Sequence, residues 1–282
     1  YARDSWYIRM SDLREKLVAE NQKVHWEPGY IRDGRMGEWL ANAKDWAISR
    51  ERYWGTPMPI WQSADESEQI VIDSVDMLKQ YTKRSGNTYV VMRHGEAEGN
   101  VKNIVSTTIE SAKKYPLTET GCSQARSAAA AIRENGGVDL IFVSPFRRTQ
   151  ETATIVTETL GLSKEQIITD ERLHDVAAGV LDDKPLADYW AFFAQGDDLF
   201  IKAPEGGETR GDVRRRMGDF LYDIEKRYTN KRILIISHQD PLIALSLAVS
   251  GLGKAHWREF GPIAYALPRA LDFTPFPHDD DY

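Results

Sequence analysis

An arginine and a histidine that follow a short apolar run could act together on an anionic substrate. The run, Tyr89–Met92, predicts a buried strand because tyrosine and valine favour strands. Arg93, His94 and Gly95 follow it directly. Open α/β sheets place their chemistry at the carboxyl ends of strands, where an arginine supplies a fixed cation and a histidine supplies a nucleophile or proton carrier. The glycine lets the backbone turn closely around a ligand.

Two later apolar runs end in residues of the same kind. Leu140–Val143 is followed shortly by Arg148, and Ile233–Ile236 is followed shortly by His238. A planar guanidinium group offers a fork of donors to phosphate oxygens. A helix that begins near Phe146 would aim its first backbone N–H groups the same way. The three runs together predict a phosphate site at the end of several strands.

Helical stretches separate these runs. Thr118 is a suitable N-cap for a helix that extends through Arg133 and stops at Gly136-Gly137. This alternation of strand and helix predicts an α/β fold with a mostly parallel sheet and helices on both faces. The other expected elements are a helix from about Phe146, a strand at Ile167-Ile168, and helices over 185–195 and 208–228.

Composition excludes several classes of protein. The 282 residues suffice for one large or two modest domains, and a net charge of −7 argues against nucleic-acid binding through a broad basic surface. The single cysteine, Cys122, excludes an internal disulfide and a cysteine-rich zinc site, which favours a reducing cytoplasm. No apolar run reaches membrane-spanning length and no signal peptide opens the chain, so we expect no membrane partner. The start at Tyr1, in the middle of a pattern, suggests a piece of a longer protein.

Five short motifs give residues 86 to about 272 a resemblance to the histidine phosphatase family, which also contains the cofactor-dependent phosphoglycerate mutases. They come in the family's order and span nearly the whole segment, and that combination is far more specific than any single motif. The motifs are Arg93-His94-Gly95-Glu96 with Asn100, Leu117-Thr118-Glu119-Thr120-Gly121 with Gln124-Ala125, Ser144-Pro145-Phe146 with Arg148 and Thr152-Ala153, Pro204-Glu205-Gly206-Gly207-Glu208, and Ser237-His238.

The resemblance implies a phosphatase that works through a covalent phosphohistidine. It assigns the nucleophile to His94 and phosphate binding to Arg93, Arg148 and His238, while Asn100 matches a position that often assists. Neutral histidine would attack phosphorus, and water would then release phosphate. No metal or other cofactor is implied, because the basic cluster already supplies the charge that a magnesium ion supplies elsewhere. The expected partner is a small phosphorylated substrate.

The residue expected to protonate the leaving oxygen departs from the family pattern. The family usually has a glutamate after a Leu-x pair, whereas Leu173-His174-Asp175 supplies an aspartate that is shorter by one methylene. Asp175 is predicted to be the general acid, with a plain loop carboxylate as the alternative. Glu96 and Arg147 are predicted to contact the substrate, with a solvated surface role as the alternative.

A second resemblance covers about the first fifth of the chain. Residues 1–61 resemble isoleucyl-tRNA synthetase in the part that follows its editing insertion and re-enters the nucleotide-binding domain. In that family the tryptophan at the position of Trp54 helps to wall the amino-acid pocket, and a core aromatic is the alternative. Ser11 is a suitable N-cap for a helix in this segment. The matching stretches are Ser5-Trp6-Tyr7-Ile8, Trp26-Glu27-Pro28, Gly34-Arg35-Met36-Gly37, Trp39-Leu40 and residues 45–57.

The synthetase-like piece lacks the signatures of adenylate chemistry. Class I synthetases use His-x-Gly-His and Lys-Met-Ser-Lys-Ser motifs, and neither occurs in this sequence. We therefore expect tRNA, ATP and isoleucine to be partners only through a parent isoleucine–tRNA ligase, in which the phosphatase-like domain is inserted. The expected division is residues 1–61 as a small synthetase-derived α/β piece of the class I catalytic domain, 62–87 as a linker containing a hairpin or helix, 88–272 as the histidine phosphatase-like domain, and 273–282 as an acidic tail or return to the synthetase.

Three functions are compatible with these motifs. The favoured one is hydrolysis of phosphate monoesters by a domain carried within a synthetase-like protein. The second is a module that only binds a phosphate-bearing ligand or RNA end, which the aspartate at position 175 keeps open. The third is a phosphomutase, which requires the phosphohistidine to outlive the exchange of product. The sequence does not identify the substrate.

Overall fold

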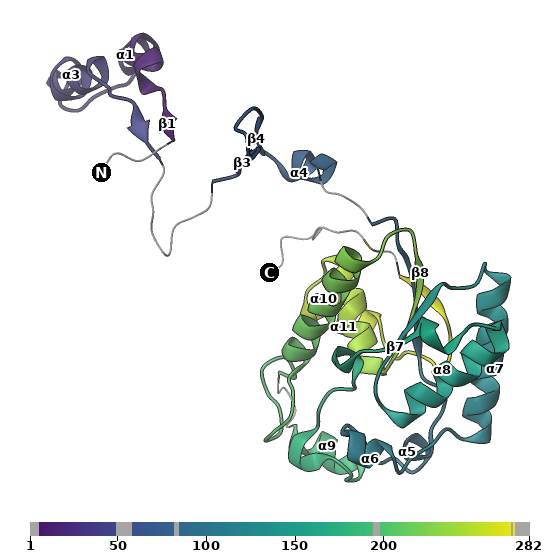
Figure 1. Ribbon diagram of the computed structural model, residues 1–282. Coiled ribbons are helices and arrows are strands. Elements are labelled where there is room, and N and C mark those ends of the chain that lie inside the picture. The colour runs from purple at the N-terminus through teal and green to yellow at the C-terminus, as the bar shows by residue number, and fades with distance from the viewer. Residues whose placement is uncertain (1–5, 49–57, 82–84, 194–197, 272, 274–282) are drawn as a thin grey trace. The chain divides into compact units, whose positions relative to one another are not determined.

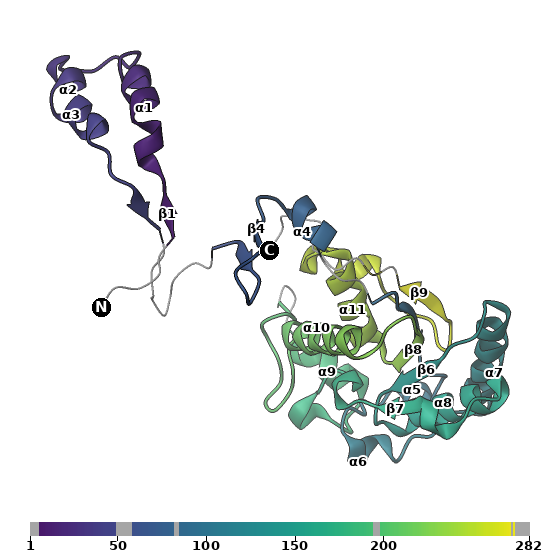
Figure 2. The same ribbon diagram turned by 45° about the horizontal axis from the view of Figure 1, so that its top comes forward.

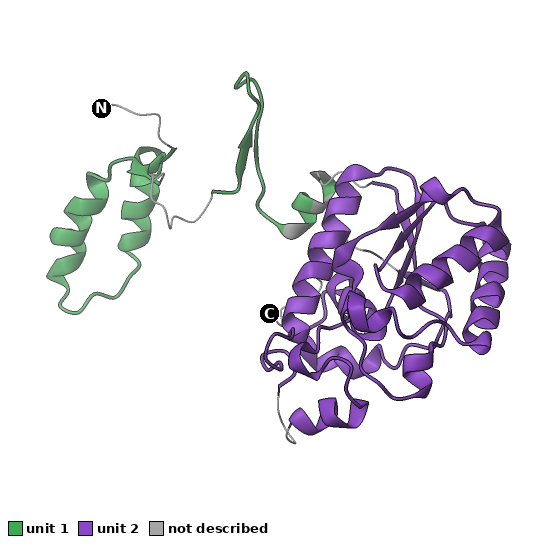
Figure 3. Ribbon diagram, turned by 60° about the horizontal axis from the view of Figure 1, so that its bottom comes forward, with its two compact units in different colours: residues 1–81 green, residues 82–282 purple. Residues whose placement is uncertain are grey.

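The chain divides into two compact units, Tyr1–Tyr81 and Thr82–Tyr282 (Figure 3). The computed structural model describes residues 6–48, 58–81, 85–193, 198–271 and 273. Trp54, the predicted remnant of an amino-acid pocket, lies outside the described residues, as does the acidic tail after Phe273. No helix in the described part of the chain is long and apolar enough to cross a membrane.

Short elements make up the first unit (Figure 1). Strands β1 and β2 pair antiparallel around a helical segment, and β3 and β4 form an antiparallel hairpin that is followed by helix α4. The segment predicted to contain a hairpin or a helix therefore contains both. The elements are β1 (Tyr7–Ile8), η1 (Met10–Leu13), α1 (Arg14–Asn21), α2 (Tyr30–Asp33), α3 (Arg35–Ala41), β2 (Trp46–Ala47), β3 (Ile60–Gln62), β4 (Gln69–Val71) and α4 (Val75–Tyr81).

The first α-helix begins later than the sequence predicted. Ser11 lies within the 3-10 turn η1, and its backbone N–H and hydroxyl donate to Asp45 Oδ1 at 2.9 and 2.6 Å. Helix α1 starts at Arg14, with Leu13 at the N-cap position. The prediction that Ser11 caps the helix was wrong, because a residue distant in sequence accepts its hydroxyl hydrogen bond.

A five-stranded sheet forms the centre of the second unit (Figures 1 and 2). The strand order is β7-β6-β8-β5-β9, in which the first four strands are parallel and β9 is antiparallel to β5. The predicted mostly parallel sheet is confirmed. The edge strand β9 was not predicted, because its sequence Arg-Ala-Leu holds no β-branched or aromatic residue that would indicate a strand. The strands are β5 (Thr88–Arg93), β6 (Leu140–Val143), β7 (Ile167–Thr169), β8 (Arg232–Ser237) and β9 (Arg269–Leu271).

Two long helices of this unit, α7 and α10, begin at threonines that cap them. Thr118 Oγ1 accepts the N–H of Gly121 at 3.0 Å at the start of α7, and Thr209 Oγ1 accepts the N–H of Asp212 at 3.0 Å at the start of α10. The helices and turns are α5 (Glu98–Val101), α6 (Ile109–Ala112), α7 (Glu119–Glu134), α8 (Arg147–Leu160), η2 (Lys164–Gln166), η3 (Glu171–Leu173), η4 (Gly179–Leu181), α9 (Leu186–Phe192), α10 (Arg210–Arg227), α11 (Gln239–Ser250) and η5 (Lys254–Glu259).

Alternation along the central strands divides the apolar side chains between two cores. In β5, Tyr89 and Val91 belong to the core that α10 and α11 cover, whereas Val90 and Met92 belong to the core that α7 and α8 cover. Figures 1 and 2 show these helix pairs on opposite faces of the sheet. Burial on both faces explains why the strands are continuous apolar runs in the sequence.

Parallel pairing brings the carboxyl ends of three strands to one edge of the sheet. Arg93 at the end of β5 pairs in register with Ser237 at the end of β8, and β6 ends beside them at Val143. Helices α8 and α11 begin just after β6 and β8, with Phe146 and His238 as their N-cap residues. The first backbone N–H groups of both helices therefore lie at the edge that carries the predicted phosphate ligands.

Candidate active site

His94 is buried directly after β5, and its ring is held in one orientation. The side chain is 1% exposed, and Nδ1 lies 2.7 Å from the carbonyl oxygen of Gly95. Because a carbonyl can only accept, the proton is on Nδ1 and the lone pair is on Nε2. Burial lowers the pKa of His94 well below its usual value, and the charges of Arg148 and Arg93 lower it further. The ring is therefore neutral at pH 7, with a nucleophilic Nε2.

Arg148, in the first turn of α8, connects the functional side chains. Its side chain is only 4% exposed. Nε donates to His94 Nε2 at 3.1 Å, and Nη1 donates to the carbonyl and hydroxyl oxygens of Ser106, each at 3.0 Å. Nη2 donates to Asp175 Oδ2 at 3.1 Å and to His238 Nδ1 at 3.0 Å. One cation thus orients two histidines and a carboxylate.

His238 is fully buried between Arg148 and the loop after β6. Since Nδ1 accepts from Arg148, the proton is on Nε2, which donates to Ser144 Oγ at 2.8 Å. Burial lowers the pKa of His238 well below its usual value, with further lowering by Arg148 and His94. In this structure His238 is a neutral group that holds Arg148, rather than a second source of positive charge.

Asp175 approaches the same guanidinium group from the loop after η3. Its Oδ2 accepts from Arg148 and lies 3.6 Å from His238 Nδ1, while the side chain stays 24% exposed. Arg216 on α10 holds this loop from behind, because its Nη2 donates to the Asp175 carbonyl oxygen at 3.2 Å and its Nε donates to Glu208 Oε1 at 2.9 Å. The carboxylate is therefore fixed in the site yet reachable by solvent.

Arg93 presents an unused donor to the same region. Its Nη1 donates to Gln239 Oε1 at 3.2 Å and to the Ile263 carbonyl oxygen at 3.0 Å, and its guanidinium carbon lies 4.1 Å from the centre of the Tyr265 ring. Among the residues that the structure describes, Arg93 Nε is the one buried side-chain polar atom without a hydrogen-bond partner. A buried donor in this condition costs about 1–3 kcal/mol, so the site favours an acceptor supplied by a ligand.

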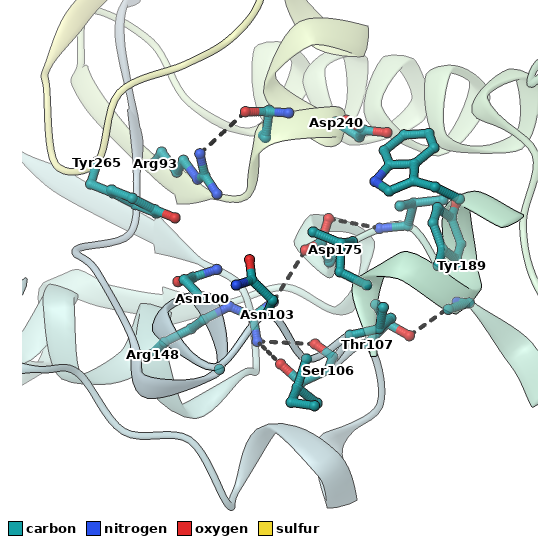
Figure 4. A pocket seen from close by; sticks show the side chains of 18 residues that line it. Arg93, Asn100, Asn103, Ser106, Thr107, Arg148, Asp175, Tyr189, Asp240 and Tyr265 are labelled. Atoms are coloured by element: carbon teal, nitrogen blue, oxygen red, sulfur yellow. Dashed lines mark hydrogen bonds and ion pairs between the residues drawn. The ribbon is translucent and has the colours of Figure 1, made fainter. Parts of the chain in front are cut away.

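A cavity of about 390 Å³ opens over these groups (Figure 4). In that view Arg93 and Arg148 lie at one end, Tyr189 lies at the other, and Asp175 lies between them. Asn100 also lines the cavity, while its Oδ1 accepts the backbone N–H of Ala97 at 3.1 Å. The two histidines do not line the cavity and contact it through Arg148.

The part of the chain that forms this site is similar to a known family. The sequence profile of the "Histidine phosphatase superfamily (branch 1)" matches residues 89–274, which include the whole site described above. The chain belongs to this superfamily. The second unit, Thr82–Tyr282, is called the phosphatase unit below.

Solved phosphatases share the fold of the phosphatase unit. The mycobacterial glucosyl-3-phosphoglycerate phosphatase, solved with VO3, is 25% identical, with a TM-score of 0.57 over 67% of this chain and 93% of that one. The alpha-ribazole phosphatase from Shigella flexneri is 22% identical, with a TM-score of 0.57 over 67% of this chain and 91% of that one. The α/β fold predicted for residues 88–272 is that of histidine phosphatases.

The first unit is similar to a different family. The profile "tRNA synthetases class I (I, L, M and V)" matches residues 1–107. The cytoplasmic isoleucine–tRNA ligase of Arabidopsis thaliana is 51% identical over 76 residues, which are 27% of this chain and 6% of that protein. The resemblance to isoleucyl-tRNA synthetase is thus confirmed, and the chain spans less than a tenth of the length of this relative.

Two predicted substrate contacts of the phosphatase unit, Glu96 and Arg147, do not line the cavity. Glu96 Oε1 accepts the hydroxyl of Thr118 at 2.8 Å, so the carboxylate faces the start of α7. Arg147 is exposed and its Nε donates to Glu151 Oε1 at 2.7 Å. Successive residues on a helix point in different directions, so only Arg148 of this arginine pair faces the site.

Gly95 serves the packing of the turn rather than the approach of a ligand. A Cβ atom on Gly95 would lie 2.5 Å from the carbonyl oxygen of Gly121, and a Cβ atom on Gly121 would lie 2.0 Å from the carbonyl oxygen of Glu96. The two glycines therefore let the turn after β5 lie against the start of α7. The Gly95 N–H donates to Thr152 Oγ1 at 3.1 Å on α8, which fixes the turn from the other side.

Several side chains that hold the arginines or His238 were not predicted. Ser144 stood in the Ser-Pro-Phe motif directly after a predicted strand, so its position was a usable signal. Ser106, Gln239 and Tyr265 gave no signal, because they come from separate loops and a helix start that only the folded chain brings to the arginines.

The charged residues that line the cavity are Arg93, Arg148, Asp175 and Asp240. The two carboxylates do not form a metal cluster, since no three His, Cys, Asp or Glu side chains within the described ranges are arranged to hold a metal ion. Among the described residues that line the cavity, the two arginines are the cations that an anionic group would meet.

Proposed function

We propose that the phosphatase unit hydrolyses phosphate monoesters through a phosphohistidine on His94. The observation that carries this proposal is the set of hydrogen bonds around Arg148, which joins His94, His238 and Asp175. A nucleophile, a general acid and a phosphate-binding cation are thus in one connected group. The phosphatases among the similar structures support the same reaction class.

Binding would place the phosphoryl group between the two arginines. A phosphate ester dianion carries two negative charges, and Arg93 Nε is a buried donor that lacks an acceptor. Backbone N–H groups at the starts of α8 and α11 add favourable dipoles at the same edge of the sheet. A phosphate oxygen would also take over the bond that Arg148 Nε makes to His94 Nε2, which frees the nitrogen lone pair for attack.

The first chemical step transfers the phosphoryl group to His94. Nε2 attacks phosphorus, the N–P bond forms, and the bond from phosphorus to the ester oxygen breaks. Asp175, which lies between the arginine end and the far end of the cavity, gives its proton to the departing oxygen. The Gly95 carbonyl oxygen accepts from Nδ1–H and so stabilises the positive charge that the imidazole ring acquires.

The second step returns the enzyme to its starting state. Asp175, now a carboxylate, takes a proton from a water molecule that attacks phosphorus in line with the N–P bond. The N–P bond breaks, inorganic phosphate leaves, and Nε2 regains its lone pair. The partial exposure of Asp175 gives water access to this position.

His238 would act through Arg148 and, once phosphate is bound, on the phosphate itself. Its Nδ1 accepts from Arg148 in this structure and holds that side chain in place. A bound dianion favours a proton on Nδ1, since an opposite charge nearby raises the pKa of a histidine. His238 would then donate to a phosphate oxygen.

The reaction is proposed to need no metal ion. The two arginines supply the charge that neutralises the transferring phosphoryl group, and preorganised donors of this kind are the usual source of electrostatic stabilisation. Turnover should therefore be unchanged after EDTA treatment. Loss of turnover in EDTA with recovery on addition of magnesium would contradict this part of the mechanism.

The central test is to trap the covalent intermediate. The full chain is mixed with an aryl phosphate, quenched in alkali and analysed by peptide mass spectrometry. We expect one phosphoryl group on the peptide that contains His94, stable in alkali and lost in acid, and no such peptide in His94→Ala. Steady turnover without a phosphorylated His94 peptide would refute the mechanism, and absence of turnover would favour a binding module.

The first unit is proposed to be a fragment of a class I synthetase catalytic domain that forms no isoleucyl-adenylate alone. The adenylate motifs are absent from the sequence, although residues 1–107 match the family profile. Isoleucine, ATP and tRNA would be partners only through a complete parent ligase. Isoleucine-dependent exchange of pyrophosphate into ATP by the purified chain would contradict this.

A further inference from the structure

The end of the cavity away from Arg148 is lined by rings and a carboxylate. Leu186, Tyr189 and Trp190 line it from α9, and Asp240 lines it from the first turn of α11. Figure 4 shows Tyr189 and Asp240 close to each other at this end. The leaving group of a bound phosphate ester would extend toward this wall.

The described charged residues of the cavity wall are two arginines and two acidic residues. Arg93 and Arg148 contribute two positive charges, whereas Asp175 carries the proton that it gives up in the proposed first step and Asp240 is paired with Arg210. A phosphate dianion uses both positive charges. A second anionic group on the same substrate would then find no free cation among the described residues that line the cavity, and a charge buried without a partner is costly.

Two cations of a neighbouring pocket, which also includes Trp190, are bound to other groups. Arg210 Nε donates to Asp240 Oδ2 at 3.1 Å, and its guanidinium carbon lies 4.6 Å from the centre of the Trp257 ring. Burial raises the pKa of Asp240, and the charge of Arg210 counteracts this. Lys254 Nζ donates to Asp198 Oδ2 at 2.5 Å. Both cations line a separate surface pocket that does not include the two arginines of the site.

The side of the cavity formed by α9 is suited to contact with a flat ring. Tyr189 and Trp190 pack edge to face with ring centres 5.3 Å apart, and Trp190 is 48% exposed although it is aromatic. Burial raises the pKa of Tyr189 to about 12, and the charge of Asp240 adds to this, so the hydroxyl keeps its proton. The wall thus offers aromatic contact, a phenol and a carboxylate that accepts hydrogen bonds.

We infer that the phosphatase unit acts on phosphate monoesters of neutral alcohols that carry a flat ring, of the nucleoside 5′-monophosphate type, and disfavours esters with a second anionic group. The inference rests on the proposed function, because it takes the arginine end as the phosphate site. It assigns Tyr189 and Trp190 to the ring and Asp240 to the rejection of anions and the acceptance of hydroxyl or amino donors.

Two matched pairs of substrates test the two halves of the inference. Glycerol 3-phosphate and 3-phosphoglycerate differ by a carboxylate in place of a hydroxymethyl group, and we expect kcat/KM to be at least about tenfold higher for the neutral ester. Adenosine 5′-monophosphate and ribose 5-phosphate differ by the base, and aromatic contact should favour the nucleotide by about tenfold. p-Nitrophenyl phosphate reports the basal chemistry.

Variants assign each preference to its residue. Asp240→Asn keeps the shape but removes a charge and leaves Arg210 as an uncompensated cation, so the preference for glycerol 3-phosphate over 3-phosphoglycerate should fall severalfold or reverse. Tyr189→Ala and Trp190→Ala should each reduce the preference for the nucleotide, whereas Tyr189→Phe should retain it. Tyr222→Ala, which removes an exposed tyrosine on α10, serves as the matched control.

The outcomes separate this inference from the proposed function. If p-nitrophenyl phosphate is hydrolysed through His94 but 3-phosphoglycerate equals or exceeds glycerol 3-phosphate, or ribose 5-phosphate equals the nucleotide, the inference is overturned and the proposed function stands. If p-nitrophenyl phosphate is not hydrolysed and His94 is never phosphorylated, both fail. Both ratios near tenfold, and reduced by the named variants, support the inference.

Discussion

The two units differ in how many buried side chains each contains. Among the described side chains of the first unit, only Asn21, Ala43 and Ile72 are buried, while rings such as Trp39 are 65% exposed. The phosphatase unit encloses two cores on either side of its sheet and a site whose side chains contact one another. The first unit is nevertheless much more similar in sequence to its relative, at 51% identity against 25% for a solved phosphatase.

A high sequence identity to a relative therefore does not mean that a unit buries a core of its own. Identity reports the origin of a segment, whereas a stable core requires that the apolar face of each element find a partner within the same chain. The first unit retains the pattern of a synthetase but has few internal partners for its rings. The phosphatase unit has the lower identity to its solved relative, yet it contains helices on both faces of its sheet.

The largest difference between the two units is expected for substitution of His94. His94→Ala removes the proposed nucleophile, so turnover should fall on the order of 10⁴-fold or more. Trp39→Ala in the first unit should leave turnover unchanged, because Trp39 belongs to the other unit. Phosphatase assays with circular dichroism on both variants test this. Comparable turnover by natively folded His94→Ala would disprove the assignment.

Substitution of two adjacent arginines in α8 should have very different effects on kcat/KM. Arg148→Ala removes the cation that binds His94, His238 and Asp175, and kcat/KM should fall about 10²–10³-fold, as for the loss of one preorganised donor. Arg147→Ala removes an exposed guanidinium that pairs with Glu151, and kcat/KM should stay within about twofold. Equal losses in the two variants would show that the tertiary placement of Arg148 is unimportant.

The role of Asp175 can be tested by comparing substrates whose leaving groups differ in basicity. An alkyl phosphate leaves as a basic alkoxide that needs a proton, whereas a nitrophenyl phosphate leaves as a stabilised anion. Asp175→Asn should therefore reduce turnover of the alkyl ester by about 10²–10⁴-fold and that of the aryl ester far less. If both esters lose the same factor, Asp175 only shapes its loop and is not the general acid.

A smaller effect concerns stability in acid. The pKa values of His94 and His238 are lowered in the folded chain, so below about 6.5 the unfolded chain binds more protons. The free energy of unfolding should therefore fall as the pH drops from 6.5, by up to about 1.4 kcal/mol per pH unit for each histidine. Urea titrations between pH 7 and 5 measure this slope.

The stability prediction has a matched control in the same unit. His94→Ala should make the dependence on pH shallower, whereas Val180→Ala, which removes an exposed side chain without a titratable group, should leave it unchanged. A slope that does not respond to His94→Ala would contradict the lowered pKa of this histidine.

Sequence patterns predicted those features that depend on residues close together in the chain. Apolar runs such as Leu140–Val143 match strand β6 as predicted, and Thr118 caps α7 as expected. Motif order was enough to indicate the superfamily, and the predicted strand ends were enough to group Arg93, His94 and His238 at one edge of the sheet. These features depend on neighbours in the chain or on the simple rule that parallel strands end at one edge.

The side chains that face the cavity, and the protonation state of His94, depend on contacts between distant segments and could not be predicted from the sequence. The direction of Arg148 rather than Arg147, the turn of Glu96 toward Thr118, and the neutral state of His94 depend on packing from several distant segments. The same holds for the wall formed by Tyr189 and Asp240, whose residues come from separate helices. Burial and the position of charges act through space, so a pattern along the chain carries little information about them.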